Sequence, residues 1–141
     1  GYNQRGGAIL FALAAILVSC FSTLPIYDVG VKHKMKLKDS SVVFDAQAAL
    51  LFALWRIELA MRAYGPVIVT SMKDGKHSAN SLHYSGMAVD IRSKHLTQEE
   101  SRKVFFALRN DLGPDYDVLL EAENTENEHL HVEYDAKVKV A

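Results

Sequence analysis

The sequence is poor in cysteine and proline, and neither sign of charge is in excess. It has one cysteine and three prolines, and its 16 basic and 17 acidic residues leave a net charge of −1. A lone cysteine excludes internal disulfides, so the chain must bury a hydrophobic core, for which 141 residues suffice. The balanced charge lacks the basic excess typical of nucleic-acid binding. We therefore expect a folded domain with no nucleic-acid partner.

The first 25 residues differ from the rest in carrying almost no charge. Arg5 is the only charged side chain before Asp28, and an unbroken apolar run of 11 residues extends from Ala8 to Val18. This length is typical of a signal peptide, whereas a membrane-spanning helix needs about 20 apolar residues. The run leads into Leu-Val-Ser-Cys, ending at Cys20, which resembles the lipobox in which bacterial lipoproteins are lipidated.

Several interpretations of residues 1–25 stay open. The segment is a signal peptide, a lipoprotein signal lipidated at Cys20, or, extended to Leu24, a signal anchor that stays in the membrane. A helix buried against a partner, with Cys20 incidental, is the remaining alternative. The first three predict export to the cell envelope or periplasm, with the protein secreted or attached to a membrane through this segment.

Residues 26–141 have the patterns of one domain that mixes strands and helices. Strands are predicted where apolar and polar residues alternate, or where a short apolar run occurs, at 29–37, 67–70 and 87–92. A hairpin is predicted from 116–121 and 129–134 around a polar turn. Because strands and helices do not alternate regularly, we expect an α+β fold with an antiparallel sheet and packed helices.

Two helices are predicted from apolar periodicity and from end signals. Apolar residues at spacings of three and four over 43–64 predict an amphipathic helix with Trp55 in the core. Thr97 and Glu100 have the spacing of a capping box, which predicts the start of a second helix. A Gly-Pro pair follows each segment and ends it.

Four of the six histidines lie in two short segments, at His77, His83, His129 and His131. Residues two apart in a strand share a face, so His129 and His131 point the same way. Two adjacent imidazoles facing a core are costly unless something uses them, and a metal ion is the commonest user. His83 and Asp90 could supply further ligands, and a set of two histidines, one carboxylate and an open position is typical of a catalytic zinc site.

Two motifs carry a resemblance to a known family. They are Ser81-x-His83-x-x-Gly86-x-Ala88-x-Asp90 and, about forty residues later, His129-x-His131. This pattern resembles the M15 family of zinc peptidases. The family includes D-alanyl-D-alanine carboxypeptidases, phage L-alanyl-D-glutamate endolysins and, by fold, the hedgehog signalling domain. The resemblance covers residues 42–135 and implies a hedgehog/DD-peptidase-like fold.

The resemblance also implies roles for individual residues. His83, Asp90 and His131 would bind one Zn²⁺, while His129 and His77 would stabilise the oxyanion. Gly86 and Ala88 would be small because the backbone passes close to the metal. Ser81 would orient the loop by hydrogen bonds, and Tyr84 would line the cleft or pack beneath it.

Two assignments within the resemblance stay open. The general base is Glu121, at the end of the first hairpin strand, or alternatively Glu128, three residues before His131. Glu133 is expected to be a strand residue or to contact one of the metal ligands. The arginine with which carboxypeptidases of the family often hold the substrate carboxylate is missing after residue 70. Lys73, Lys76 or Arg92 are candidates to replace it.

The function implied is a zinc-dependent peptidase that hydrolyses peptidoglycan stem peptides at a D-Ala-D-Ala or L-Ala-D-Glu bond, in the cell envelope or encoded by a phage. The alternative is a zinc-stabilised, non-catalytic binding or structural module of an envelope or phage particle. Fold alone does not decide between them.

Overall fold

The computed structural model describes residues 35–136, which form a five-stranded sheet, two α-helices and one short 3₁₀-helix. The strands follow one another along the chain as β1 (Met35–Leu37), β2 (Val67–Ser71), β3 (Ala88–Arg92), β4 (Tyr116–Glu121) and β5 (His129–Tyr134). Their order in the sheet is β1-β2-β3-β5-β4. The predicted segment 1–25 with Cys20, and the first part of the predicted strand 29–37, lie outside the described residues.

The expectation of an α+β fold is confirmed, but the sheet is mixed rather than purely antiparallel. β1 and β2 pair in parallel, whereas the β2–β3, β3–β5 and β4–β5 pairs are antiparallel. The helix α2 (Ala48–Met61) lies between β1 and β2 in the chain. A helical crossover of this kind returns the chain to the same end of the sheet, which makes the two strands parallel.

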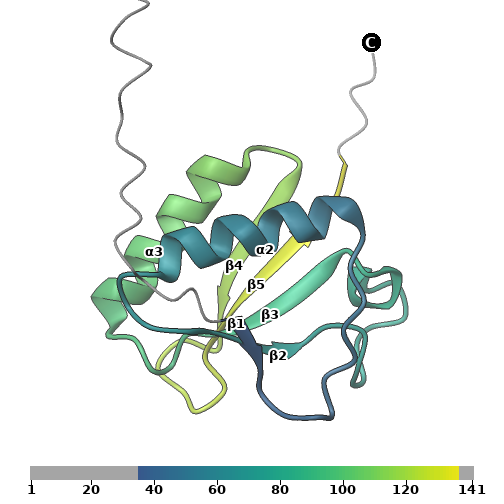
Figure 1. Ribbon diagram of the computed structural model, residues 1–141, viewed down its shortest axis with the longest axis horizontal. Coiled ribbons are helices and arrows are strands. Elements are labelled where there is room, and N and C mark those ends of the chain that lie inside the picture. Colours follow the sequence, from purple (N-terminus) through teal and green to yellow (C-terminus); the bar gives the residue numbers. More distant parts are fainter. Residues whose placement is uncertain (1–34, 137–141) are drawn as a thin grey trace, which may run out of the picture. The chain divides into compact units, whose positions relative to one another are not determined.

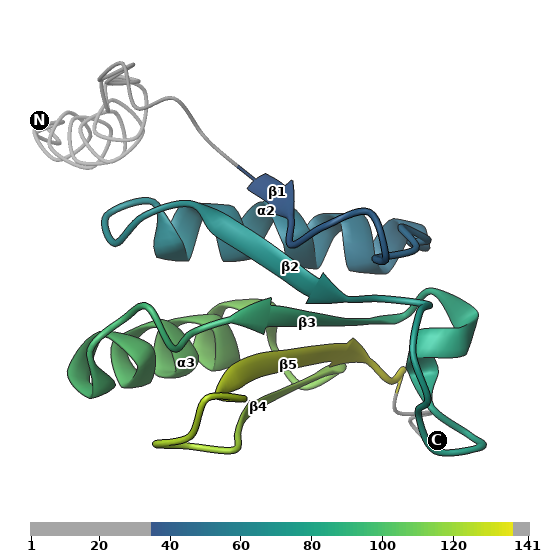
Figure 2. The same ribbon diagram turned by 90° about the horizontal axis from the view of Figure 1, so that it is seen from below.

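Both helices cover the same face of the sheet (Figure 1, Figure 2). In α2 the buried residues recur at spacings of three and four: Leu50, Ala53, Leu54, Ile57 and Met61. They form one core with inward-facing strand residues such as Val89, Ile91, Leu130 and Val132. Each large apolar side chain buried here stabilises the fold by about 1.5–3 kcal/mol. Residues that alternate with these along β3 and β5 point to the opposite face of the sheet, which is polar.

The predicted first helix is too long, and the placement of Trp55 in the core is wrong. The helix begins at Ala48 rather than at residue 43, and the Trp55 side chain is 52% exposed. Leu51 and Phe52 are also about half exposed, so α2 is apolar around most of its circumference. Apolar periodicity therefore marks the buried stripe only weakly in this helix.

The second helix and the hairpin follow the sequence signals. α3 (Gln98–Leu112) starts with the predicted capping box: the Thr97 hydroxyl accepts from the Glu100 N–H, and the Glu100 carboxylate accepts from the Thr97 N–H. Gly113, with φ of 80°, ends the helix. β4 and β5 have the bounds predicted from alternation, so the hairpin prediction is confirmed.

Candidate metal centre

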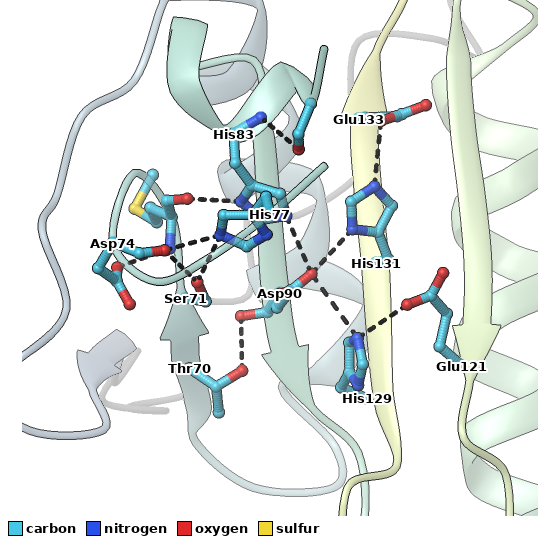
Figure 3. Close-up of polar contacts among 12 residues, drawn as sticks. Thr70, Ser71, Asp74, His77, His83, Asp90, Glu121, His129, His131 and Glu133 are labelled. Atoms are coloured by element: carbon cyan, nitrogen blue, oxygen red, sulfur yellow. Dashed lines mark hydrogen bonds and ion pairs between the residues drawn. The ribbon is translucent and has the colours of Figure 1, made fainter. Parts of the chain in front are cut away.

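Three side chains converge on the polar face of the sheet (Figure 3). Asp90 in β3 and His131 in β5 are direct cross-strand partners, and His83 comes from the 3₁₀-helix η1 (Leu82–Ser85). The Asp90 carboxylate oxygen Oδ1 lies 2.8 Å from His131 Nδ1 and 3.4 Å from His83 Nε2. One ligand atom from each residue lies within 4.8 Å of the others. This group can hold a metal ion, as the motifs predicted.

The second ring nitrogen of each histidine is held by the protein. His83 Nδ1–H donates to the carbonyl oxygen of Met72 at 2.6 Å, which leaves Nε2 facing Asp90. His131 Nε2 lies 3.1 Å from a carboxylate oxygen of Glu133, which leaves Nδ1 facing Asp90. Such contacts fix the orientation of a ligating imidazole and raise its basicity. The two histidines therefore present opposite ring nitrogens to the same point.

The charges of the cluster suit a cation. Burial alone would raise the pKa of Asp90, but hydrogen bonds with His131 and His83 hold it well below its ordinary range. Burial alone would lower the pKa of His131, but hydrogen bonds with Asp90 and Glu133 raise it to about 9. The ring of His131 thus lies between the carboxylates of Asp90 and Glu133. A metal ion bound at Nδ1 would displace the proton on that nitrogen.

The backbone near Asp90 is irregular on the side of β2. The β2–β3 register shifts between Val69 and Ser71, opposite Asp90, and the hydroxyl of Thr70 donates to the Asp90 carbonyl oxygen. Bulges of this kind re-aim the chain next to functional sites. Met72, whose carbonyl holds His83, follows directly after this bulge.

Glu121 and His129 form a second polar pair beside the metal group. They are direct cross-strand partners in β4 and β5, and His129 Nε2 lies 3.1 Å from Glu121 and 3.8 Å from Asp90. His129 Nδ1–H donates to the Asn127 carbonyl oxygen, which leaves Nε2 facing the Glu121 carboxylate. The Glu121 side chain is 47% exposed and can contact water. This carboxylate therefore lies beside the metal group and within reach of solvent.

The carboxylate of Glu128, the alternative general base, is held by residues outside the metal group. It is 4% exposed, and one carboxylate oxygen accepts from the Ser93 and Ser101 hydroxyls. The other oxygen accepts from the side-chain amide of Gln98 and the N–H of Asn124. Burial alone would raise the pKa of Glu128, but these hydrogen bonds lower it. Both oxygens are thus occupied in contacts that tie the hairpin turn to α3.

His77 lies against the metal group rather than within it. Its ring stacks on that of His83, with centroids 3.9 Å apart and an interplanar angle of 9°. Its Nε2–H donates to the Asp74 carbonyl oxygen at 2.7 Å, and Ser71 Oγ lies 3.3 Å away. The Tyr84 hydroxyl accepts from the N–H and donates to the carbonyl of His77. Tyr84 therefore holds the loop of His77 through both of these hydrogen bonds.

The small residues of the first motif, Ser81, Gly86 and Ala88, are explained by different contacts. Ser81 accepts a hydrogen bond from the His83 N–H and so orients η1, in line with its expected role. Gly86 ends η1 with φ of 70°, and an added Cβ would lie 3.2 Å from the carbonyl oxygen of Asp45. The need for glycine thus comes from this left-handed turn and from Asp45, not from the metal group, contrary to expectation. Ala88 is buried and pairs with Glu133.

Two hollows adjoin the metal group. A cavity of about 630 Å³ is lined by His77, Ser81, His83, Asp90, Leu119, Glu121, His131 and Glu133, among others. A cavity of about 380 Å³ shares Asp90 with it and includes Arg92 and His129. Neither Lys73 nor Lys76, the other candidates for a substrate carboxylate, is among the residues that line these two cavities.

Two carboxylates make contacts that the sequence indicates weakly or not at all. Glu133 contacts the Nε2 of His131, and its position two residues later on the same strand is the signal that indicated this contact. Asp74 organises the loop by accepting from the N–H groups of Met72 and Val43, both at 3.0 Å. No local pattern in the sequence indicated the contact with Val43.

Comparison with protein-family models, curated proteins and solved structures finds no match. The family resemblance therefore rests on the two motifs. Among residues 35–136, no helix has both the length and the apolar character needed to cross a membrane.

Proposed function

We propose that this protein is a zinc-dependent peptidase of the M15 type, with its hedgehog/DD-peptidase-like fold, that hydrolyses peptidoglycan stem peptides. The observation that carries the proposal is the position of the Glu121–His129 pair next to the group formed by His83, Asp90 and His131. A purely structural metal site is closed by four protein ligands, whereas a catalytic zinc site has three and an open position. Here three ligands border a cavity of about 630 Å³, which supports a catalytic role over a structural one.

The donor set of two imidazole nitrogens and one carboxylate oxygen is one that zinc takes. Zinc bound here would supply Lewis acidity and lower the pKa of a water molecule. Glu121, half exposed at the rim, accepts the proton of the attacking water and returns it to the leaving amine. His129, held by the Asn127 carbonyl, orients Glu121 and places an N–H near the oxygen that gains negative charge.

His77 has a supporting part in this mechanism. Its stacked ring limits the rotation of His83, and its Nε2–H is already engaged by the Asp74 carbonyl. Only Nδ1 is left, and in the neutral ring this nitrogen is an acceptor that cannot donate to an oxyanion. His129 is therefore the stronger of the two histidines proposed for that task.

The proposed location is the cell envelope, or a phage particle that meets it. The apolar and nearly uncharged composition of residues 1–25 supports export or membrane attachment, with Cys20 as the lipidation site of the lipoprotein form. The substrate, a peptide of the cell wall, lies in that compartment.

The test is a digest of purified peptidoglycan by the zinc-loaded full chain, with the released peptides identified by mass spectrometry. Glu121→Gln should retain zinc and lose about 10²- to 10⁴-fold in rate. Glu123→Gln is the matched control, because Glu123 follows Glu121 by two residues but pairs with Arg102. If the loaded protein releases no peptide, the non-catalytic binding module is the better description.

A further inference from the structure

The outward side of α2 carries a cluster of exposed apolar side chains. Among residues 35–136, five of the nine large apolar side chains that are exposed lie in one short stretch: Val43, Phe44, Leu51, Phe52 and Trp55. Trp55 follows Leu51 by four residues and Phe52 by three, so these three share one side of the helix, which we call the α2 patch. The rings of Phe52 and Trp55 are neighbours, with centroids 5.9 Å apart.

The α2 patch has little charge in its surroundings on the helix. The stretch from Ala48 to Trp55 contains no charged residue. Arg56, the next residue, lies over the Trp55 ring at 5.1 Å from its centroid and pairs with Asp111 of α3. Trp, Phe and Leu beside a cation are the side chains with which helices lie in the interface of a lipid bilayer.

The area of the α2 patch decides between a second protein copy and a bilayer as its partner. Three large side chains that are each about half exposed offer roughly 300 Å². A specific protein–protein interface takes about 800 Å² from each partner. A surface as small as the α2 patch binds stably only when a second attachment holds it against its partner.

The segment that precedes the described domain supplies such an attachment in the membrane-attached form of the protein. Ten residues separate Leu24 from Met35, and they span at most about 36 Å. If the attachment is a lipid on Cys20, fourteen residues span at most about 50 Å. The domain is thereby kept at a high effective concentration beside the bilayer, where weak docking of the α2 patch suffices.

We propose that the α2 patch docks on a phospholipid bilayer, with Leu51, Phe52 and Trp55 at the boundary between the headgroups and the acyl chains. The inference rests on the membrane-attached form of the proposed function. α2 covers one face of the sheet (Figure 2), and Asp90 and His131 belong to the opposite face because they alternate with core residues of β3 and β5. Docking through α2 therefore turns the metal group away from the bilayer, toward the cell wall.

The experiment uses the fluorescence of Trp55, which is the only tryptophan of the chain and lies in the α2 patch. The full chain is bound to vesicles of phosphatidylcholine and phosphatidylglycerol in which some of the phosphatidylcholine is brominated at one chosen depth of its acyl chains. An interfacial helix buries its apolar face about 5–10 Å into the headgroup and acyl boundary. We expect a blue-shifted emission that bromine near the headgroup end quenches strongly and bromine near the chain terminus quenches weakly.

A double variant tests the α2 patch while it keeps the probe. Leu51→Ser with Phe52→Ser removes two half-exposed apolar side chains, which should lower the docking equilibrium constant by about 10- to 150-fold. Most of the quenching should then be lost, although the chain stays attached through its first 25 residues. Phe106→Ser is the control, because Phe106 of α3 is 57% exposed but lines a separate hollow with Leu119 and Leu120. It should keep the quenching, and circular dichroism verifies that each variant is folded.

The outcomes separate this inference from the proposals on which it rests. If the chain is bound to vesicles but bromine at no depth quenches Trp55, the docking is overturned and the membrane attachment stands. A blue shift that increases with protein concentration and is not quenched shows a second copy on the α2 patch and also overturns the docking. If the full chain does not bind vesicles, the membrane-attached location has failed together with the docking. Should the double variant unfold, the depth profile of the unsubstituted chain decides.

Discussion

Replacing Glu128 with alanine is expected to destabilise the domain strongly while leaving the proposed catalytic groups in place. The carboxylate is 4% exposed and accepts four hydrogen bonds, two from hydroxyls and two from N–H donors. The Gln98 amide and the Asn124 N–H are only part-buried, whereas the hydroxyls of Ser93 and Ser101 are fully buried. Two buried donors left without an acceptor cost about 1–3 kcal/mol each. We expect a loss of about 4 kcal/mol in the free energy of unfolding.

Glu128→Gln is the informative companion variant. Its amide oxygen can accept from Gln98 and Asn124, and its amide N–H₂ can donate to the hydroxyls of Ser93 and Ser101. All four contacts survive, and only the added strength of the charged acceptor is lost. Because charged hydrogen bonds exceed neutral ones by about 1–2 kcal/mol, we expect this variant to lose about that amount.

Urea denaturation at a fixed zinc concentration measures both variants, since bound metal itself raises apparent stability. A loss of about 4 kcal/mol corresponds to a fall of at least about 15 °C in Tm for a domain of this size. Below the melting range, Glu128→Ala should retain hydrolysis to within about tenfold of the unsubstituted chain. If it unfolds like the unsubstituted chain but loses hydrolysis and keeps zinc, then Glu128 is the base and the assignment to Glu121 is wrong.

The difference in the free energy of unfolding between the unsubstituted chain and Glu128→Gln should depend on pH, because the pKa of Glu128 is lowered. A carboxylate whose folded pKa lies below its ordinary value of 4.5 contributes its full stabilisation above that pH. The contribution is lost as the pH falls through the folded pKa. The gap in stability between the unsubstituted chain and Glu128→Gln should thus be constant from pH 7 to about pH 5 and narrow below about 4.5. A gap that widens toward acid pH would contradict the hydrogen bonds described here.

The remaining predictions concern the metal group. His83→Ala and His131→Ala should each abolish metal retention, because each removes one of the three ligands found among residues 35–136; full metal content after dialysis against a weak chelator would refute the assignment. Glu133→Gln should weaken zinc binding by about 10- to 100-fold, because the carboxylate that holds His131 Nε2 is lost. The control is the exposed Glu126→Gln, and unchanged zinc affinity in Glu133→Gln would show that Glu133 does not orient the ligand.

The elements that the sequence predicts well are those with short-range causes. The capping box of α3 involves residues three apart, and the β4–β5 hairpin depends on alternation within each strand and a polar turn between them. The direction of β1 has a long-range cause. Alternation indicates that a segment is a strand but not which neighbour it pairs with, so the parallel β1–β2 pair was not predictable from this pattern.

The position of Trp55 shows a second limit of local patterns. The apolar residues of α2 extend around most of the helix, and only contact with the sheet determines which of them are buried. Five residues of the helix at the expected spacing face the core, while Trp55 instead packs beside Phe52, with ring centroids 5.9 Å apart. Periodicity therefore predicts that a helix has a buried stripe more securely than it predicts the residues on its flank.

Some features of the candidate site could likewise be predicted from the sequence, and others could not. The motif resemblance grouped His83, Asp90 and His131, but the register that makes Asp90 and His131 cross-strand partners does not follow from either strand alone. The choice of ring nitrogen does not follow from spacing. It depends on the Met72 carbonyl after the bulge in β2 for His83, and on Glu133 for His131. Glu128 shows the same limit of sequence patterns. Alternation along β5 predicts that its side chain points away from His131. Only its contacts with α3 show that its carboxylate stabilises the fold. Residues close together in the sequence, such as Glu128 and His131, can thus have different roles, and the contacts of each side chain show which role it has.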